Sequence, residues 1–226
     1  MKRNRKRFGI WVQQHVQSLL SLYIFVTVLF VMGVVFGAII VNTLSDSQKQ
    51  DLLHYMGYFF QGLNKNSIAE PRIAFQHAMG DHLKTLGLMW ILGLSIVGLP
   101  LILILVFLKG LGIGFTVGFL VNQLSWKGLW FAMLAVLPHN LLVVPVMIFV
   151  AVSGLQFSLL LVKNRLIQRR GTIYPQFLTY SVSVTAMAIV LVIASFFEAY
   201  VSPWLMRSAV PPLEHAQAWL GTFINL

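Results

Sequence analysis

The sequence lacks cysteine and is poor in charge. The absence of cysteine among its 226 residues excludes disulfide bonds and thiolate metal sites. Only 10% of the residues are charged, whereas soluble domains carry about 25%. The net charge of +10 comes from basic residues that cluster at the ends of apolar runs, which argues against a nucleic-acid-binding surface. This composition is typical of a chain whose surface faces lipid.

Long apolar runs give the outline of the fold. A hydrocarbon core of about 30 Å requires about 20 helical residues. The first 18 residues carry five basic side chains before an apolar run over 19–41. This run is longer than the ~7–15 apolar residues of a cleavable signal peptide, so we interpret it as a retained signal anchor. We expect five membrane crossings, over 19–41, 85–108, 110–137, 139–162 and 174–197.

The distribution of charge predicts the orientation. With the N-terminus inside and the C-terminus outside, ten of the sixteen Lys and Arg residues fall inside, as the positive-inside rule requires. The cytoplasmic segments are then 1–18 and 163–173, and the outer segments are 42–84 and 198–226. The predicted fold is therefore an all-α integral membrane protein with five transmembrane helices and amphipathic helices on its outer side.

The outer segment 42–84 contains helix signals. Ser45 and Gln48 have the spacing of a capping box, and an apolar stripe at helical spacing follows them. This pattern predicts an amphipathic helix over 46–63 that lies on the membrane or on a partner. A second capping box at 67–70 and Pro71 indicate another helix start, with the helix continuing towards 108. The stripe that we assign to partner binding consists of Leu52, Met56, Phe59 and Leu63.

The region 110–137 is expected to form a broken or re-entrant third crossing. We expect the preceding crossing to kink at Pro100 and to end at Lys109. A glycine cluster follows, and 126–128 interrupts the next apolar run. Small residues at this spacing permit either close helix packing or the flexibility of a broken helix. The glycines of interest are Gly110, Gly114 and Gly118, with Gly33 and Gly37 in the first crossing.

Signatures of enzymes are absent from the sequence. It contains no HExxH, GxSxG or P-loop pattern. The histidines are scattered, and His77 and His82 are five residues apart, which is a poor spacing for a metal pair on one helix face. We expect Asp81 and His82 to form a solvated helix end. The sequence thus predicts a non-enzymatic protein without cofactors or metals.

Two polar residues stand out because polar groups at membrane depth are costly. His139 begins the expected fourth crossing and Glu198 ends the fifth, so both fall towards the outer leaflet. Either they pair directly, or Glu198 is an interfacial carboxylate and His139 a capping group. We predict that Glu198 is held by a polar contact, from His139 or Tyr200, that locks the fifth crossing to the fourth.

Three motifs in this order resemble the stage II sporulation protein M family, in its Bacillus-type form. They are the glycine cluster of 110–114, Pro138-His139, and Glu198 followed by Pro203 at the end of the last crossing. Many members continue Pro-His with Gly and then a Glu three residues further, but here those positions are Asn140 and Val143. A role that depends on that glutamate is lost or moved elsewhere.

The resemblance implies a scaffold of the engulfment machinery in the mother-cell membrane at the sporulation septum. Such a protein recruits stage II sporulation proteins P and D, which degrade peptidoglycan. We further expect contacts to anionic lipids and a homodimer. Two alternatives stay open: a transporter or permease-like subunit that uses 110–145, and a sensor of membrane shape that uses 46–63. A continuous polar cavity would favour transport, and a flat outer apolar surface would favour a scaffold.

Overall fold

The computed structural model describes residues 19–64, 70–164 and 173–209. Their backbone is helical almost throughout, and this part of the chain contains no strand. The elements are α2 (Leu20–Ile40), the 3-10 turn η1 (Val41–Thr43), α3 (Asp46–Asn64), α4 (Pro71–Gly93), α5 (Gly98–Ala135), α6 (Leu137–Val162), α7 (Tyr174–Phe196), the π-helical turn η3 (Phe197–Val201) and α8 (Ser202–Ala209).

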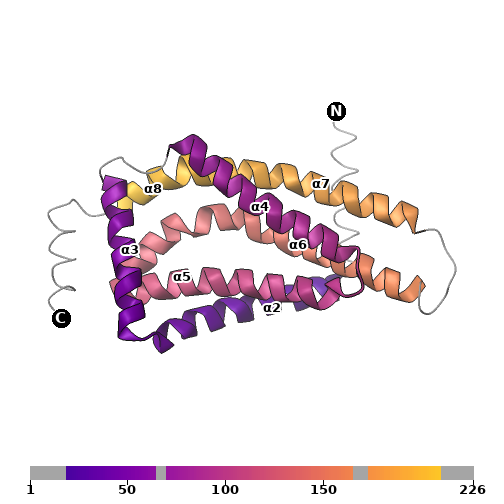
Figure 1. The fold of residues 1–226 in the computed structure, drawn as a ribbon, viewed down its shortest axis with the longest axis horizontal. Helices are drawn as coiled ribbons and strands as arrows, with labels where there is room; N and C mark the ends of the chain where they lie inside the picture. Colours follow the sequence, from indigo (N-terminus) through magenta and orange to yellow (C-terminus); the bar gives the residue numbers. More distant parts are fainter. Residues whose placement is uncertain (1–18, 65–69, 165–172, 210–226) are drawn as a thin grey trace.

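The helices form an elongated bundle. Helices α2, α5, α6 and α7 run along its length, α4 crosses it obliquely, and α3 lies across one end (Figure 1). Four segments are long and apolar enough to cross a membrane: 20–43, 98–135, 137–162 and 174–206. Helix α6 is the central one, since Val143, Val150 and Val152 on it are all fully buried. The all-α prediction is thus confirmed, with four apolar helices and a fifth, α4, packed against them.

The boundary between the second and third expected crossings was predicted wrongly. No helix covers 85–108: α4 ends at Gly93 and α5 begins at Gly98. The turn between them is fixed from outside, because the hydroxyl of Ser158 donates to the carbonyl of Ser95 at 2.6 Å. Pro100 lies in the first turn of α5, where a proline needs no hydrogen-bond partner, and it therefore starts the helix and does not kink it.

The predicted interruption near 126 is confirmed at Ser125. This residue has φ 50° and ψ −132°, and it is the one non-glycine residue with positive φ in the described chain. The chain folds back here, so that a Cβ on Gly128 would meet the carbonyl of Leu120. Pro138 then lies in the first turn of α6, as expected for a proline that follows a helix break.

Glycines join α2 to α5. A Cβ on Gly110 would meet the carbonyl of Phe30, and one on Gly114 would meet that of Val34. On the opposite helix, a Cβ on Gly37 would lie 2.7 Å from the amide nitrogen of Phe115. Gly33 and Gly118 make equally close approaches to the facing backbone. Of the two alternatives for these glycines, the structure shows close packing.

A second, smaller core sits at the end of the bundle covered by α3. The predicted capping box is formed, with Ser45 N donating to Gln48 Oε1 at 3.0 Å and Gln48 N to Ser45 Oγ at 3.4 Å. Met56 of α3 packs against Phe131 of α5 and its neighbours. The amphipathic helix over 46–63 is therefore confirmed. Part of its apolar stripe is used inside the molecule.

Candidate functional site

A carboxylate and a histidine pair between α4 and the end of α7. His82 Nε2 lies 3.0 Å from Glu198 Oε2, and the His82 residue is only 9% exposed. The expectation that His82 is solvated is therefore wrong, and so is the choice of His139 or Tyr200 as the partner of Glu198. Tyr200 instead stacks on Phe196, with ring centroids 4.5 Å apart. The expectation that Glu198 is held by a polar contact is confirmed, but the contact joins the end of the fifth crossing to α4 and not to the fourth crossing, α6.

The burial of His82 could have been predicted from the helical periodicity of the residues that follow it. Leu86, Met89 and Gly93 follow at i+4, i+7 and i+11, and all three are buried on the inner face of α4. His82 continues this stripe by one turn. Asp81, its neighbour, lies on the outer face and is exposed, which is why the pair Asp81-His82 was mistaken for a solvated end.

Two more ionisable residues approach this pair. His139 lies in the first turn of α6 and is close enough to Glu198, His82 and Lys109 for their charges to act on it. Its Nε2 is 2.9 Å from Nδ2 of Asn140, which also donates to the carbonyl of Val136. We call His82, Lys109, His139 and Glu198 the polar cluster. Each member comes from a different element: α4, α5, α6 and η3.

A small cavity adjoins the polar cluster. His82, Thr85 and Lys109 supply its polar lining, and its interior has room for about one water molecule. Val143 lines the same cavity and is fully buried. Many members of the family that the sequence resembles have a glutamate at the position of Val143. In this chain the carboxylate of the polar cluster is that of Glu198, from η3.

The backbone at Glu198 is itself unusual. Residues 197–201 form a π-helical turn between α7 and α8, and such turns are frequent at functional sites. Within the described chain, no group of three or more His, Cys, Asp or Glu residues is placed to hold a metal ion. The arrangement can hold a water and can tie four elements together through hydrogen bonds and charge.

A second set of polar contacts joins α4 to α7 nearer the α4–α5 turn. The hydroxyl of Tyr180 donates to the carbonyl of Met89 at 3.2 Å, and Trp90 Nε1 donates to Ser181 Oγ at 3.2 Å. Gly93 gives Tyr180 the room it needs, because a Cβ there would lie 2.9 Å from Tyr180 Cζ. Helix α4 is thus fastened to the α7–η3 segment at two levels.

The remaining predicted site residues lie apart from the polar cluster. Gly110, Gly114 and Gly118 face α2, and Pro203 lies half-buried in the first turn of α8. On α3, Leu52 is half-buried and Phe59 is 44% exposed, while the side chain of Leu63 lies outside the described residues. The most exposed aromatic residues described on that helix are Tyr55 and Tyr58, at 74% and 67%, and neither belongs to the stripe predicted from the sequence.

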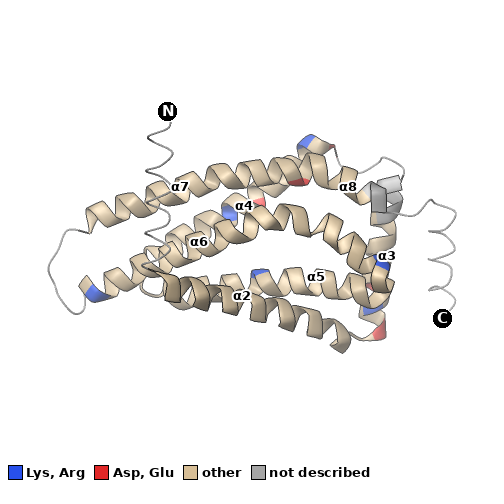
Figure 2. Cartoon of the chain, turned by 180° about the vertical axis from the view of Figure 1, so that it is seen from behind, with Lys and Arg blue, Asp and Glu red and all other residues tan. Residues whose placement is uncertain are grey.

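Figure 2 shows where charge lies along the bundle: charged residues mark both ends, and a few lie between the ends on α4, α5 and the α7–α8 segment.

The sequence model of the family described as Stage II sporulation protein M matches residues 26–203. No curated protein and no solved structure matches the chain. The family match covers all three motifs, from the glycines of α5 through Pro138-His139 to Pro203. The chain belongs to the stage II sporulation protein M family.

Proposed function

We propose that this sporulation membrane protein is a non-enzymatic scaffold that recruits stage II sporulation proteins P and D to the septal membrane. It would lie in the mother-cell membrane with its N-terminus inside and its C-terminus outside. Helix α4 would serve as the fifth crossing beside the four apolar helices. The family supports a role in sporulation, and the exposed face of α3 supports recruitment.

The observation that carries the proposal is the way α3 is displayed. Its inner face is anchored through Met56 to the second core, so the helix is held across the end of the bundle (Figure 1). Its outer face presents Tyr55 and Tyr58, with the ring of His54 6.0 Å from that of Tyr58. Exposed tyrosines on a fixed helix suit a protein interface, since they contribute large contact area at low entropic cost.

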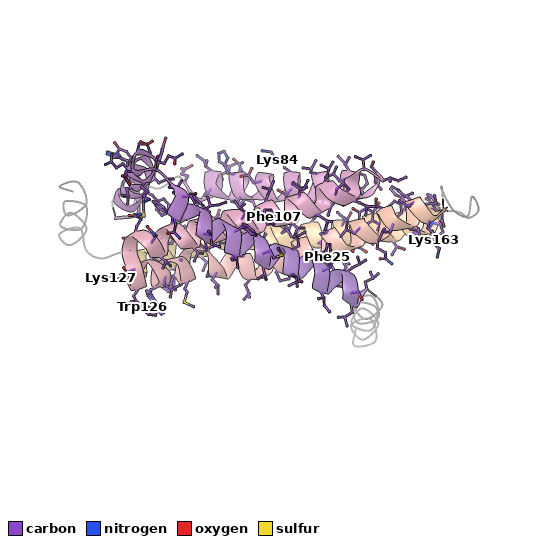
Figure 3. The ribbon with its side chains drawn as sticks, turned by 90° about the horizontal axis from the view of Figure 1, so that it is seen from below. Phe25, Lys84, Phe107, Trp126, Lys127 and Lys163 are labelled. Carbon is purple, nitrogen blue, oxygen red and sulfur yellow. The ribbon has the colours of Figure 1, made fainter. Side chains whose placement is uncertain are left out.

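The two ends of the bundle suit opposite sides of a membrane. Lys163 lies at one end, and Trp126 and Lys127 lie at the other (Figure 3). Lys163 is followed in the sequence by three arginines before Tyr174, and this basic end would face the cytoplasm and its anionic lipids. Trp126 is 83% exposed, as is typical of aromatic residues at a membrane surface.

Recruitment is tested with a double variant, Tyr55→Ser and Tyr58→Ser, in the full-length protein. The expected result is that proteins P and D no longer co-purify with it from detergent, while its amount in the membrane is unchanged. The control is Tyr174→Ser, which removes a tyrosine that is 69% exposed at the start of α7. Normal co-purification with the double variant would overturn this docking face.

Two residues of the apolar stripe that the sequence assigns to partner binding provide a second test. Phe59→Glu, on the exposed side, should also abolish recruitment. Leu52→Glu is less specific, because Leu52 is half-buried and its replacement disturbs the seating of α3. A variant that loses recruitment while its unfolding temperature is unchanged separates docking from folding.

Transport is the second candidate, and the polar cluster favours it. Ionisable residues between membrane helices are typical of proton and ion pathways. The predicted site of transport in 110–145 receives less support, since α5 is an uninterrupted helix from Gly98 to Leu124. A Lys109→Met variant separates the two functions: a transporter would lose ion flux in proteoliposomes, and a scaffold would keep recruitment.

A further inference from the structure

The outward face of α4 carries an exposed ion pair at a level where neighbouring helices present apolar side chains. Lys84 Nζ lies 3.6 Å from Asp81 Oδ1, and their side chains are 82% and 76% exposed. Figure 3 shows Lys84 on the side of the bundle, between Lys163 at one end and Lys127 at the other. The four apolar helices run past this level (Figure 3), so a bilayer that they cross would place the pair within its hydrocarbon region.

Exposure of this pair to lipid would be costly. A single Lys or Asp at the centre of a membrane helix is strongly disfavoured, because hydrocarbon solvates neither charge. Other outward faces of the bundle carry the residues that lipid requires, such as Phe25 of α2, Ile104 of α5 and Ile189 of α7, all more than half exposed. The face of α4 differs from them, which indicates that protein covers it.

The spacing along α4 indicates a helix as the covering element. Alternating steps of four and three residues align six positions in one stripe, the repeat of a helix–helix seam. Two of them are glycines, and a Cβ on Gly80 or Gly87 would meet no atom within 4 Å. In the α2–α5 seam, by contrast, the glycines are already covered by backbone. The stripe consists of Ile73, His77, Gly80, Lys84, Gly87 and Ile91.

We propose that a second copy of this chain packs its own α4 against this stripe. The charges are self-complementary: about a twofold axis along the membrane normal, Asp81 of each copy meets Lys84 of the other, as an isologous interface requires. A covering helix of only one charge sign would pair with one member and leave the other in hydrocarbon. Gly80 and Gly87 let the two backbones approach closely. This inference does not depend on the recruiting role of α3.

The absence of cysteine from the sequence makes the contact easy to test in the full-length protein. Gly80→Cys and Gly87→Cys, oxidised in native membranes, should each give a disulfide-linked species of twice the 25.4 kDa chain mass. The matched control is Gly112→Cys on α5, another glycine at which a Cβ would meet no atom within 4 Å. The control should give at least tenfold less dimer. Equal cross-linking at all three positions, or none at Gly80 and Gly87, would overturn the proposal.

A charge exchange identifies the covering chain. In detergent, Asp81→Lys or Lys84→Asp alone should convert a dimer to a monomer by light scattering, because each places like charges together. The double variant, Asp81→Lys with Lys84→Asp, should restore the dimer. A dimer that persists in both single variants contradicts the proposal. So does a Gly80→Cys cross-link to a chain of different mass, which would assign the face to another protein.

Discussion

His82 donates from Nε2 to Oε2 of Glu198 over 3.0 Å and so joins positions 116 residues apart. The two side chains differ in environment, because that of His82 is 10% exposed and that of Glu198 is 33% exposed. A buried imidazole and a carboxylate beside apolar helices both need a partner. Their contact fastens α4 to the turn that follows α7, at the point where Lys109 and His139 come near.

We expect Glu198→Ala to lower the free energy of unfolding by about 1–2 kcal/mol, the range for a hydrogen bond to a charged group within a membrane bundle. Glu198→Gln should cost less, since an amide oxygen still accepts the hydrogen bond from His82. Unfolding in detergent measures both. Glu70→Ala serves as the control, because Glu70 is exposed and makes no side-chain capping bond.

Double-variant analysis distinguishes this contact from a proton-transfer role. If His82 and Glu198 act as a pair, His82→Ala combined with Glu198→Ala should cost less than the sum of the single changes. A proton-transfer role predicts that Gln is as damaging as Ala in a functional assay, since neither transfers a proton. Additive losses of stability would contradict the pairing.

The glycine seam gives a sharper test of packing. Gly114→Ala should destabilise the protein by about 1–3 kcal/mol, because the new methyl group meets the carbonyl of Val34 and forces α2 and α5 apart. Gly112→Ala, two residues away and facing open space, should be neutral or stabilising, because alanine favours a helix by about 1 kcal/mol over glycine. Unfolding temperatures of the two variants, measured side by side, check this difference.

Backbone strain at Ser125 predicts a stabilising change. At φ 50° and ψ −132° a side chain is disfavoured, and such conformations cost about 1–3 kcal/mol. Ser125→Gly should therefore raise the unfolding temperature, whereas Ser125→Ala, which keeps a Cβ, should leave it unchanged or lower it. If the two variants behave alike, Ser125 is not strained in the membrane.

The proposed topology predicts which ends are accessible. Ser47→Cys in α3 should react with an impermeant thiol reagent added outside intact cells, while Lys163→Cys at the opposite end should react only after the membrane is opened. The serines at positions 67 and 208 are also candidates for single cysteines, but their side chains lie outside the described residues. Reaction of Lys163→Cys from outside would reverse the orientation.

Local patterns in the sequence predicted local structure well. Ser45 with Gln48 marked the start of α3, Pro71 marked that of α4, and Pro138 marked that of α6, because capping and proline chemistry act within one helical turn. The apolar runs predicted the long helices, because a helix that crosses the hydrocarbon core needs about 20 consecutive apolar residues. The spacing of the glycines on α5 indicated close packing without naming α2 as the partner.

Errors arose where tertiary contacts decide. The prediction of a helix end at Lys109 rests on the cost of a charge in hydrocarbon, but Lys109 lies within α5, where its side chain lines the cavity beside His82. The actual turn, over 94–97, contains no charged residue, so a hydropathy profile of the sequence does not mark it. The pairing of His82 with Glu198 depends on how α4 leans across the bundle, and no pattern within either segment contains that information.

That uncharged turn also bears on how the protein enters the membrane. The turn over 94–97 joins α4, which carries Arg72, Asp81 and Lys84, directly to the apolar start of α5. Because α4 is too polar to partition into lipid on its own, α4 and α5 would leave the translocon together as a helical hairpin, with the apolar helix carrying the charged one. With a second copy as its cover, the charged face of α4 would be shielded only after synthesis, and dimer assembly would then be a condition for stable residence in the bilayer.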